Sequence, residues 1–366
     1  MKFVIAPTAF KGTLTPGEAA EAMAAGIRRR HPGADLDIVP ISDGGDGFLE
    51  CLSRPLAAER RSVIVRGPVH APVAAPFGLT QGGTAVVEAA LAVGLALLAP
   101  GSLDAIGATS GGLGELLAEA RQAGAAEILL GLGGSASTDG GTGMARALGY
   151  RFLDESGAEL PEGGGYLHRL ARIDPSLFDP GWLMLPIRVA CDVDNQLLGP
   201  DGSAATFGPQ KGATPDQVRL LEAGLRRLAE VLRRDLGVDV SAMPFAGSAG
   251  GLGAGLSAFL GAELTAGAAL VLDEVGFGRR LDGAQALLTG EGRLDGQSLH
   301  GKAPVVAGRR ARARGLRATA LVGTVGEGWR DALGDAFDDV VALPAAAVSR
   351  AGAADRLSAA AALLEL

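Results

Sequence analysis

Short apolar runs that end in polar, glycine-rich loops recur along this chain, with helical stretches between them. Such runs cover residues 3–6, 36–41, 127–132, 188–190, 286–289 and 318–322. Strands that alternate with helices form parallel sheets, whose ligands collect at the carboxyl ends of the strands. The pattern therefore predicts an α/β fold with parallel or mixed sheets, and it places the functional residues in these loops.

The sequence contains start signals for two helices. Thr15 and Thr214 each begin a capping box, with Glu18 or Gln217 three residues later and proline at the first helical position. The second helix carries one apolar face at three- and four-residue spacing, made by Val218, Leu221, Leu225, Leu228 and Leu232. We also expect a closing helix in the Ala- and Leu-rich tail from Ala345.

The length of 366 residues is enough for two domains. The strongest cluster of Pro and Gly lies at residues 67–78. We expect residues 1–72 plus 268–366 to form a discontinuous Rossmann-like α/β domain. Residues 73–267 would form a second, inserted α/β domain, with a ligand cleft between the two.

Charge and apolar patterning limit the partners. A net charge of −8 argues against nucleic acid, which needs a basic face. The longest apolar stretch, residues 85–99, is interrupted by Glu88 and is too short to cross a membrane. Cys51 and Cys191 have no C-x-x-C spacing, so we expect reduced thiols in a cytoplasmic protein. A homodimer is left open.

Lysine is rare in this chain and is placed unusually. Only four of the 33 basic residues are lysines, and Lys11, Lys211 and Lys302 each lie beside a glycine in a loop that we expect to be exposed. A compact ammonium next to a glycine, where the backbone can approach a ligand closely, suits phosphate binding. Chance placement of three solvated lysines is the alternative.

Carboxylates occupy the same kind of loop. They are Asp43, Asp46, Asp139, Asp192, Asp194, Glu291 and Asp295. Carboxylates with Gly-flanked lysines are the components of Mg²⁺-assisted phosphoryl transfer from ATP. We predict that Asp192, directly after a strand, is the base that accepts the proton of an acceptor hydroxyl. Lys11 and Asp43 join it as catalytic candidates, and the expected metal ligands are Asp43, Asp46, Glu291 and Asp295.

Two other nucleotide motifs fit less well. Residues 296–302 match G-x-x-x-x-G-K, but Ala303 stands where the Mg²⁺-binding hydroxyl should follow, and we expect a loop before the motif. Residues 131–136 match the dinucleotide fingerprint G-x-G-x-x-A, yet residues 137–141 oppose the helix that it requires. A nicotinamide-dependent hydroxy-acid dehydrogenase remains an alternative, as does a silent relative that only binds a small acid.

Taken in order, the loops resemble those of the bacterial glycerate kinase family (type I glycerate kinases) over the whole chain. The matching segments are residues 5–7 with 10–11, 43–45, 133–136, 139–141, 190–193, 207–212, 249–253, and 289–295 with 297–298 and 301–302. The resemblance implies ATP-dependent phosphorylation of D-glycerate, with 2-phosphoglycerate favoured over 3-phosphoglycerate. It also implies two α/β domains around a cleft.

The matched loops supply the expected binding residues. Substrate or phosphate would be bound by Lys211, Lys302, Arg293, Ser135, Gly133, Gly134 and Gly290. The chain departs from the family at Thr8-Ala9, where Asp-Ser is usual, and at Thr138, Asp194 and Gln196. These departures leave open a kinase of another small hydroxy acid.

Overall fold

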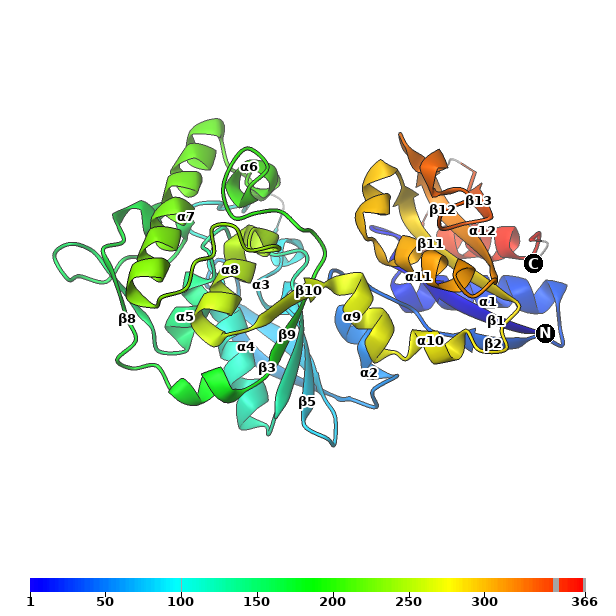
Figure 1. Cartoon of the computed structure of the whole chain (residues 1–366), viewed down its shortest axis with the longest axis horizontal. Coiled ribbons are helices and arrows are strands. Elements are labelled where there is room, and N and C mark those ends of the chain that lie inside the picture. Colours follow the sequence, from blue (N-terminus) through cyan, green and yellow to red (C-terminus); the bar gives the residue numbers. More distant parts are fainter. Residues whose placement is uncertain (100, 345–348, 365–366) are drawn as a thin grey trace. The chain divides into compact units, whose positions relative to one another are not determined.

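The computed structural model describes residues 1–99, 101–344 and 349–364. The chain forms two compact units: Met1–Leu56 with Gly267–Leu366, and Ala57–Ala266. Both ends of the chain therefore build the first unit, drawn in blue and in yellow to red in Figure 1. The expected boundary at residue 72 falls at the first residue of the strand Pro72–Leu79, which pairs along its whole length with Glu59–Arg66.

The first unit contains one parallel sheet with strand order β13-β12-β11-β1-β2. Helices α1 and α12 pack against each other and share a core with strands β1 and β11. Its elements are β1 (Lys2–Pro7), α1 (Pro16–Arg30), β2 (Asp35–Ile38), α2 (Phe48–Ser53), α9 (Gly267–Glu274), α10 (Phe277–Arg280), β11 (Ala286–Leu294), η5 (Gly296–His300), α11 (Ala303–Arg312), β12 (Arg317–Val325), η6 (Trp329–Ala332), β13 (Asp339–Ala342) and α12 (Arg350–Ala361).

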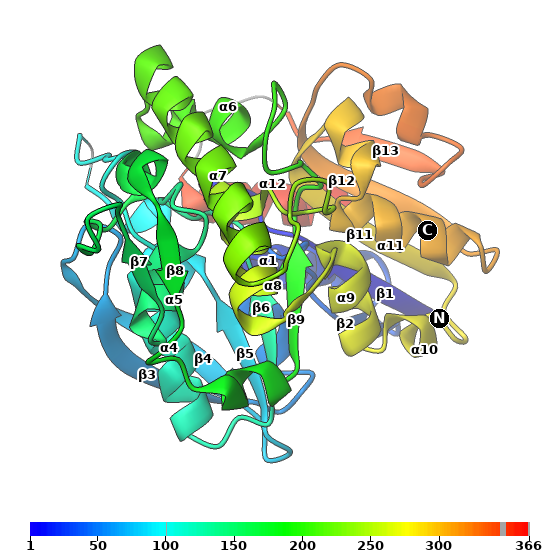
Figure 2. The same cartoon turned by 60° about the vertical axis from the view of Figure 1, so that its left-hand side comes forward.

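The second unit contains a mixed sheet with strand order β10-β9-β6-β5-β4-β3, in which β3 and β4 are antiparallel and β5, β6, β9 and β10 are parallel. Figure 2 shows β6 and β9 side by side in this sheet. Its elements are β3 (Glu59–Arg66), β4 (Pro72–Leu79), β5 (Thr84–Glu88), α3 (Ala90–Val93), η1 (Leu95–Leu97), α4 (Gly111–Gln122), β6 (Glu127–Gly131), α5 (Thr142–Ala147), β7 (Arg151–Leu153), η2 (Gly164–Arg169), β8 (Arg172–Asp174), η3 (Pro180–Met184), β9 (Ile187–Cys191), α6 (Ser203–Phe207), η4 (Pro209–Lys211), α7 (Pro215–Asp235), α8 (Ser248–Leu260) and β10 (Glu263–Ala266).

The α/β fold class is confirmed, and the local signals that predicted it are present. Both capping boxes form at the starts of α1 and α7. The four leucines predicted on the apolar face of α7 are buried, while Val218 is half-buried. The closing helix occupies Arg350–Ala361, and its expected start at Ala345 lies outside the described residues.

Strand β11 is longer than the sequence pattern predicts. The loop expected to begin at Gly290 is strand as far as Leu294, because β12 pairs alongside it up to Val325. A Cβ on Gly290 would lie 2.0 Å from the carbonyl oxygen of Leu321. Glycine is therefore needed here for the two strands to pack closely. Elsewhere, no helix in the described part of the chain is long and apolar enough to cross a membrane.

Candidate functional site

In the first unit, the segment after β1 lies over the end of β11. The amide of Thr8 donates to the carbonyl of Gly290 at 2.9 Å. A Cβ on Gly292 would lie 3.3 Å from the amide nitrogen of Lys11. The backbone of Lys11 therefore lies close to Gly292, while its side chain is exposed.

Glu291 is the buried member of this group, with 6% of its surface exposed. Lys302 Nζ lies 3.4 Å from Glu291 Oε2, and the Ser298 hydroxyl acts on the same carboxyl, while Oε1 is buried with no hydrogen-bond partner of normal geometry among the described residues. Burial raises the pKa of Glu291 to about 7; Lys302 opposes this shift and the nearby Asp43 carboxylate adds to it. The structure therefore gathers the expected residues Asp43, Glu291 and Lys302.

Other predicted residues of this unit have structural partners. Asp295 caps η5, where Oδ1 accepts from the amide of Gln297 at 3.1 Å, and Oδ2 pairs with Arg293 Nε at 3.1 Å. Arg293 is mostly exposed and Asp46 is exposed. Within the described residues, no three His, Cys, Asp or Glu side chains are arranged to hold a metal. The expected ligands that the structure describes thus do not form one metal-binding cluster, although the charges of Asp43 and Glu291 act on each other.

In the second unit, Lys211 is buried, with 3% of its surface exposed. Its Nζ donates to Ser135 Oγ at 3.2 Å and to the carbonyl oxygen of Ser137 at 2.5 Å. Both partners lie in the loop after β6, so this loop and η4 meet at the lysine. The expectation of an exposed loop is wrong for Lys211, because residues distant in sequence enclose it.

Burial also changes the acidity of Lys211. It lowers the pKa of the ammonium to about 8, while the Asp139 and Asp192 carboxylates act in the opposite direction. Asp192 follows β9 directly and is exposed, so a charged lysine and an accessible carboxylate lie near each other at the carboxyl ends of β6 and β9. Burial raises the pKa of the neighbouring Cys191 thiol to about 12, which keeps it protonated.

Neither alternative nucleotide motif has the backbone it needs. Residues 132–141 contain no helix, and the first helix after the fingerprint begins at Thr142. The amide of Leu95 donates to the carbonyl of Gly134 at 2.8 Å, so this loop runs beside the start of η1. The segment before residues 296–302 is strand β11 rather than the expected loop, but residues 296–300 then form a 3₁₀ helix instead of an open phosphate loop.

The chain is also similar in sequence to known proteins. The family model described as "Glycerate kinase family" matches residues 3–365. The chain belongs to the glycerate kinase family. A glycerate kinase of Halalkalibacterium halodurans is 42% identical, over 89% of this chain and 86% of its own length. A glycerate 2-kinase of Escherichia coli is 43% identical, over 83% and 80%.

A solved structure of this family is also similar. It is the crystal structure of a chain assigned as glycerate kinase 2 from Salmonella typhimurium, with a TM-score of 0.86 and 38% identity. The match covers 99% of this chain and 96% of that one. Fold and sequence therefore agree on the glycerate kinase family.

Sequence reasoning missed two residues beside Lys211. The carbonyl of Ser137 has no side-chain signal, so only the structure could reveal its bond to the lysine. Gly250 lies in the matched segment 249–253, but its role is steric: a Cβ there would lie 2.0 Å from the Ser137 oxygen and 2.9 Å from Lys211 Nζ. The glycine-rich composition of this segment was the available signal.

Gly250 gives a stability prediction. Its φ of +75° and its crowded position both oppose a side chain, so Gly250→Ala should lower the free energy of unfolding by about 3 kcal/mol. Gly261, at the end of the same helix, has φ +66° with nothing within 4 Å of a Cβ. Gly261→Ala should therefore cost only about 1 kcal/mol. Urea denaturation measures both, and equal costs would mean that contact with Ser137 is unimportant.

Proposed function

We propose that this protein is an ATP- and Mg²⁺-dependent kinase that phosphorylates D-glycerate, with 2-phosphoglycerate as the favoured product. The observation that carries the proposal is the buried ammonium of Lys211, fixed by Ser135 and Ser137 near the exposed carboxylate of Asp192. An anion-binding cation beside a proton acceptor is what phosphorylation of a hydroxy acid requires. Family membership and the names of the relatives support glycerate as the acceptor.

We assign each residue a role that its chemistry allows. Lys211 and Ser135 bind an anionic group of a substrate, and Gly133 and Gly134 shape the loop beside them. Asp192 accepts the proton of the attacking hydroxyl. In the first unit, Lys11 and Lys302 bind phosphate oxygens, and Arg293 is exposed for the same purpose.

Asp43 and Glu291 fit a magnesium site. Mg²⁺ is commonly held by one or two carboxylates, with water and phosphate oxygens as the other ligands. The buried, unpartnered Oε1 of Glu291 and its interaction with Asp43 match that requirement. When bound, the ion neutralises charge on the phosphate oxygens. Asp295 is engaged in capping and in its pair with Arg293, so we give it a structural role.

The test follows ADP release from ATP with D-glycerate as acceptor and identifies the product by phosphorus NMR. D-lactate keeps the carboxylate and the 2-hydroxyl but lacks the 3-hydroxyl, so it is the matched acceptor. Phosphorylation of O2 predicts slow turnover of D-lactate, whereas phosphorylation of O3 predicts none. ADP release with another small hydroxy acid alone would reassign the acceptor. Reduction of NAD⁺ by D-glycerate without ADP release would establish the dehydrogenase instead.

Two further assignments accompany this proposal. ATP as phosphoryl donor suits a cytoplasmic enzyme whose ligands are small molecules. We leave homodimerisation as a prediction, and sedimentation of the purified chain measures it.

The lowered pKa of Lys211 predicts a pH profile. Because this pKa is about 8 rather than the usual 10.5, the ammonium is present below pH 8 and is lost above it. We expect kcat/KM for glycerate to fall about tenfold per pH unit above that point. Lys211→Arg keeps its charge to much higher pH, so this alkaline limb should disappear although activity is reduced. An unchanged limb in the arginine variant would assign the titration to another group.

A further inference from the structure

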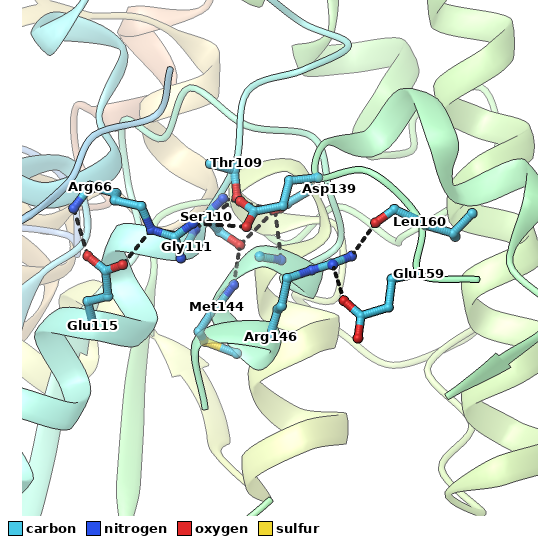
Figure 3. Close-up of polar contacts among 12 residues, drawn as sticks. Arg66, Thr109, Ser110, Gly111, Glu115, Asp139, Met144, Arg146, Glu159 and Leu160 are labelled. Atoms are coloured by element: carbon cyan, nitrogen blue, oxygen red, sulfur yellow. Dashed lines mark hydrogen bonds and ion pairs between the residues drawn. The ribbon is translucent and has the colours of Figure 1, made fainter. Parts of the chain in front are cut away.

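Asp139 is a fully buried carboxylate surrounded by hydrogen-bond donors. Its Oδ2 accepts from the amide and hydroxyl of Ser110, both at 2.8 Å, and from the amide of Gly143 at 3.1 Å. Its Oδ1 accepts from the amide of Gly141 at 3.2 Å. Figure 3 shows Asp139 turned toward Ser110, whose hydroxyl accepts in turn from the amide of Met144 at 2.9 Å. Asp139 thus joins the start of α4 to the start of α5.

Asp139 also lies in the loop after β6, whose residues bond to Lys211. Ser137, whose carbonyl accepts from Lys211 Nζ, is two residues before Asp139. The same loop makes a further backbone contact. The amide of Gly140 donates to the carbonyl of Gly250 at 3.1 Å. Movement of Asp139 would therefore displace the Ser137 carbonyl oxygen that accepts the hydrogen bond from Lys211 Nζ.

Asp139 and Lys211 also carry opposite charges in the same buried region of the second unit. Both side chains are buried, and a buried ammonium needs a nearby anion to stay protonated. Two carboxylates, Asp139 and Asp192, favour the charged form of the lysine. Asp192 is exposed to water, which screens its charge, so the buried Asp139 is the better placed of the two.

We propose that Asp139 is a positioning residue for the reaction: its carboxylate fixes the loop whose Ser137 carbonyl holds Lys211, and its charge keeps the lysine ammonium protonated. In this role Asp139, which is fully buried, acts through Lys211. The inference rests on the proposed function, in which Lys211 binds an anion.

The test measures the titration of Lys211 by NMR of protein labelled with ¹³C at the lysine ε-carbons. The chain has only four lysines, so the Lys211 signal is assigned by its loss in Lys211→Arg. In the wild type this signal should titrate near pH 8. Asp139→Asn keeps the size of the side chain but removes its charge, and should shift the titration down by about one pH unit. The alkaline limb of kcat/KM should shift with it.

Ser110→Ala is the matched control. It removes the hydroxyl that bonds to Asp139 Oδ2 and to the Met144 amide, but leaves the carboxylate charged. A purely structural role predicts the same small shift in both variants. The proposal predicts a shift in Asp139→Asn alone, and an unshifted lysine in that variant would overturn it. Because this readout needs neither ATP nor glycerate, its failure is separate from failure of the proposed kinase activity.

If Asp139→Asn does not fold, two further measurements still test the proposal. The titration is then repeated in trimethylamine N-oxide, which favours the compact state. In addition, Asp139→Asn combined with Lys211→Met removes both buried charges and should be more stable than Asp139→Asn alone. A double variant no more stable than the single one would contradict charge balance between the two residues.

Discussion

Replacing Lys211 by methionine is expected to reduce kcat/KM for glycerate by about a thousandfold, because it removes a buried cation that pairs with the charge of a substrate. Methionine fills a similar volume, and its loss of charge relieves the cost of burying an ammonium. The free energy of unfolding should nevertheless fall by about 3 kcal/mol, because Ser135 and Ser137 lose a donor and the buried Asp139 carboxylate loses its nearby cation. Steady-state kinetics and urea denaturation measure the two effects.

Lys2→Met is the matched control for this variant. Lys2 Nζ donates to the carbonyls of Arg280 at 2.7 Å and Asp282 at 3.1 Å, in a region with no proposed function. Its replacement should leave kcat/KM unchanged within about a factor of two. If Lys211→Met retains activity close to that of Lys2→Met, the buried lysine does not bind substrate, and the proposed site in the second unit is wrong.

Asp192→Asn is expected to lower kcat by about a hundredfold or more while leaving the KM for ATP unchanged. Asparagine is nearly isosteric with aspartate but cannot accept a proton in the same way, and general bases contribute effects of this size. Asp201, an exposed aspartate in the segment that follows β9, supplies the control. Asp201→Asn should keep the wild-type kcat.

Asp43→Asn separates the base from the metal ligand. Loss of a carboxylate beside Glu291 should raise the Mg²⁺ concentration needed for half-maximal rate, and excess Mg²⁺ should restore much of the activity. The opposite result reverses the two assignments: Asp192→Asn keeps its turnover, and Asp43→Asn stays inactive at saturating Mg²⁺.

Much of the fold could be predicted from local sequence. Capping boxes at Thr15 and Thr214 involve residues three positions apart, so the sequence contains both partners of each bond. The apolar face of α7 follows helical spacing and is buried as that spacing indicates. Alternation of strands and helices predicted the α/β class, because each run carries its own period.

The site was predictable in part. Gly-flanked lysines and strand-end carboxylates led to the prediction of Lys211, Asp192, Glu291 and Lys302, which the structure places in two polar groups, one in each unit; their roles stay predictions. Residue type alone could not show that Asp295 bonds to Gln297 and Arg293, since these contacts form only in the folded chain, and its role as a metal ligand stays a prediction.

The sequence by itself determined which elements form, where the helices begin and which loops carry charge, because these depend on neighbours a few residues apart. Three features are visible only in the tertiary structure: β11 continues through Gly290, Lys211 is buried, and Asp139 bonds to Ser110. Each of these depends on a partner far along the chain: β12 for Gly290, the loop after β6 for Lys211, and Ser110 for Asp139. Burial and electrostatic environment are set by such partners, and they turn an ordinary lysine into one with a pKa of about 8.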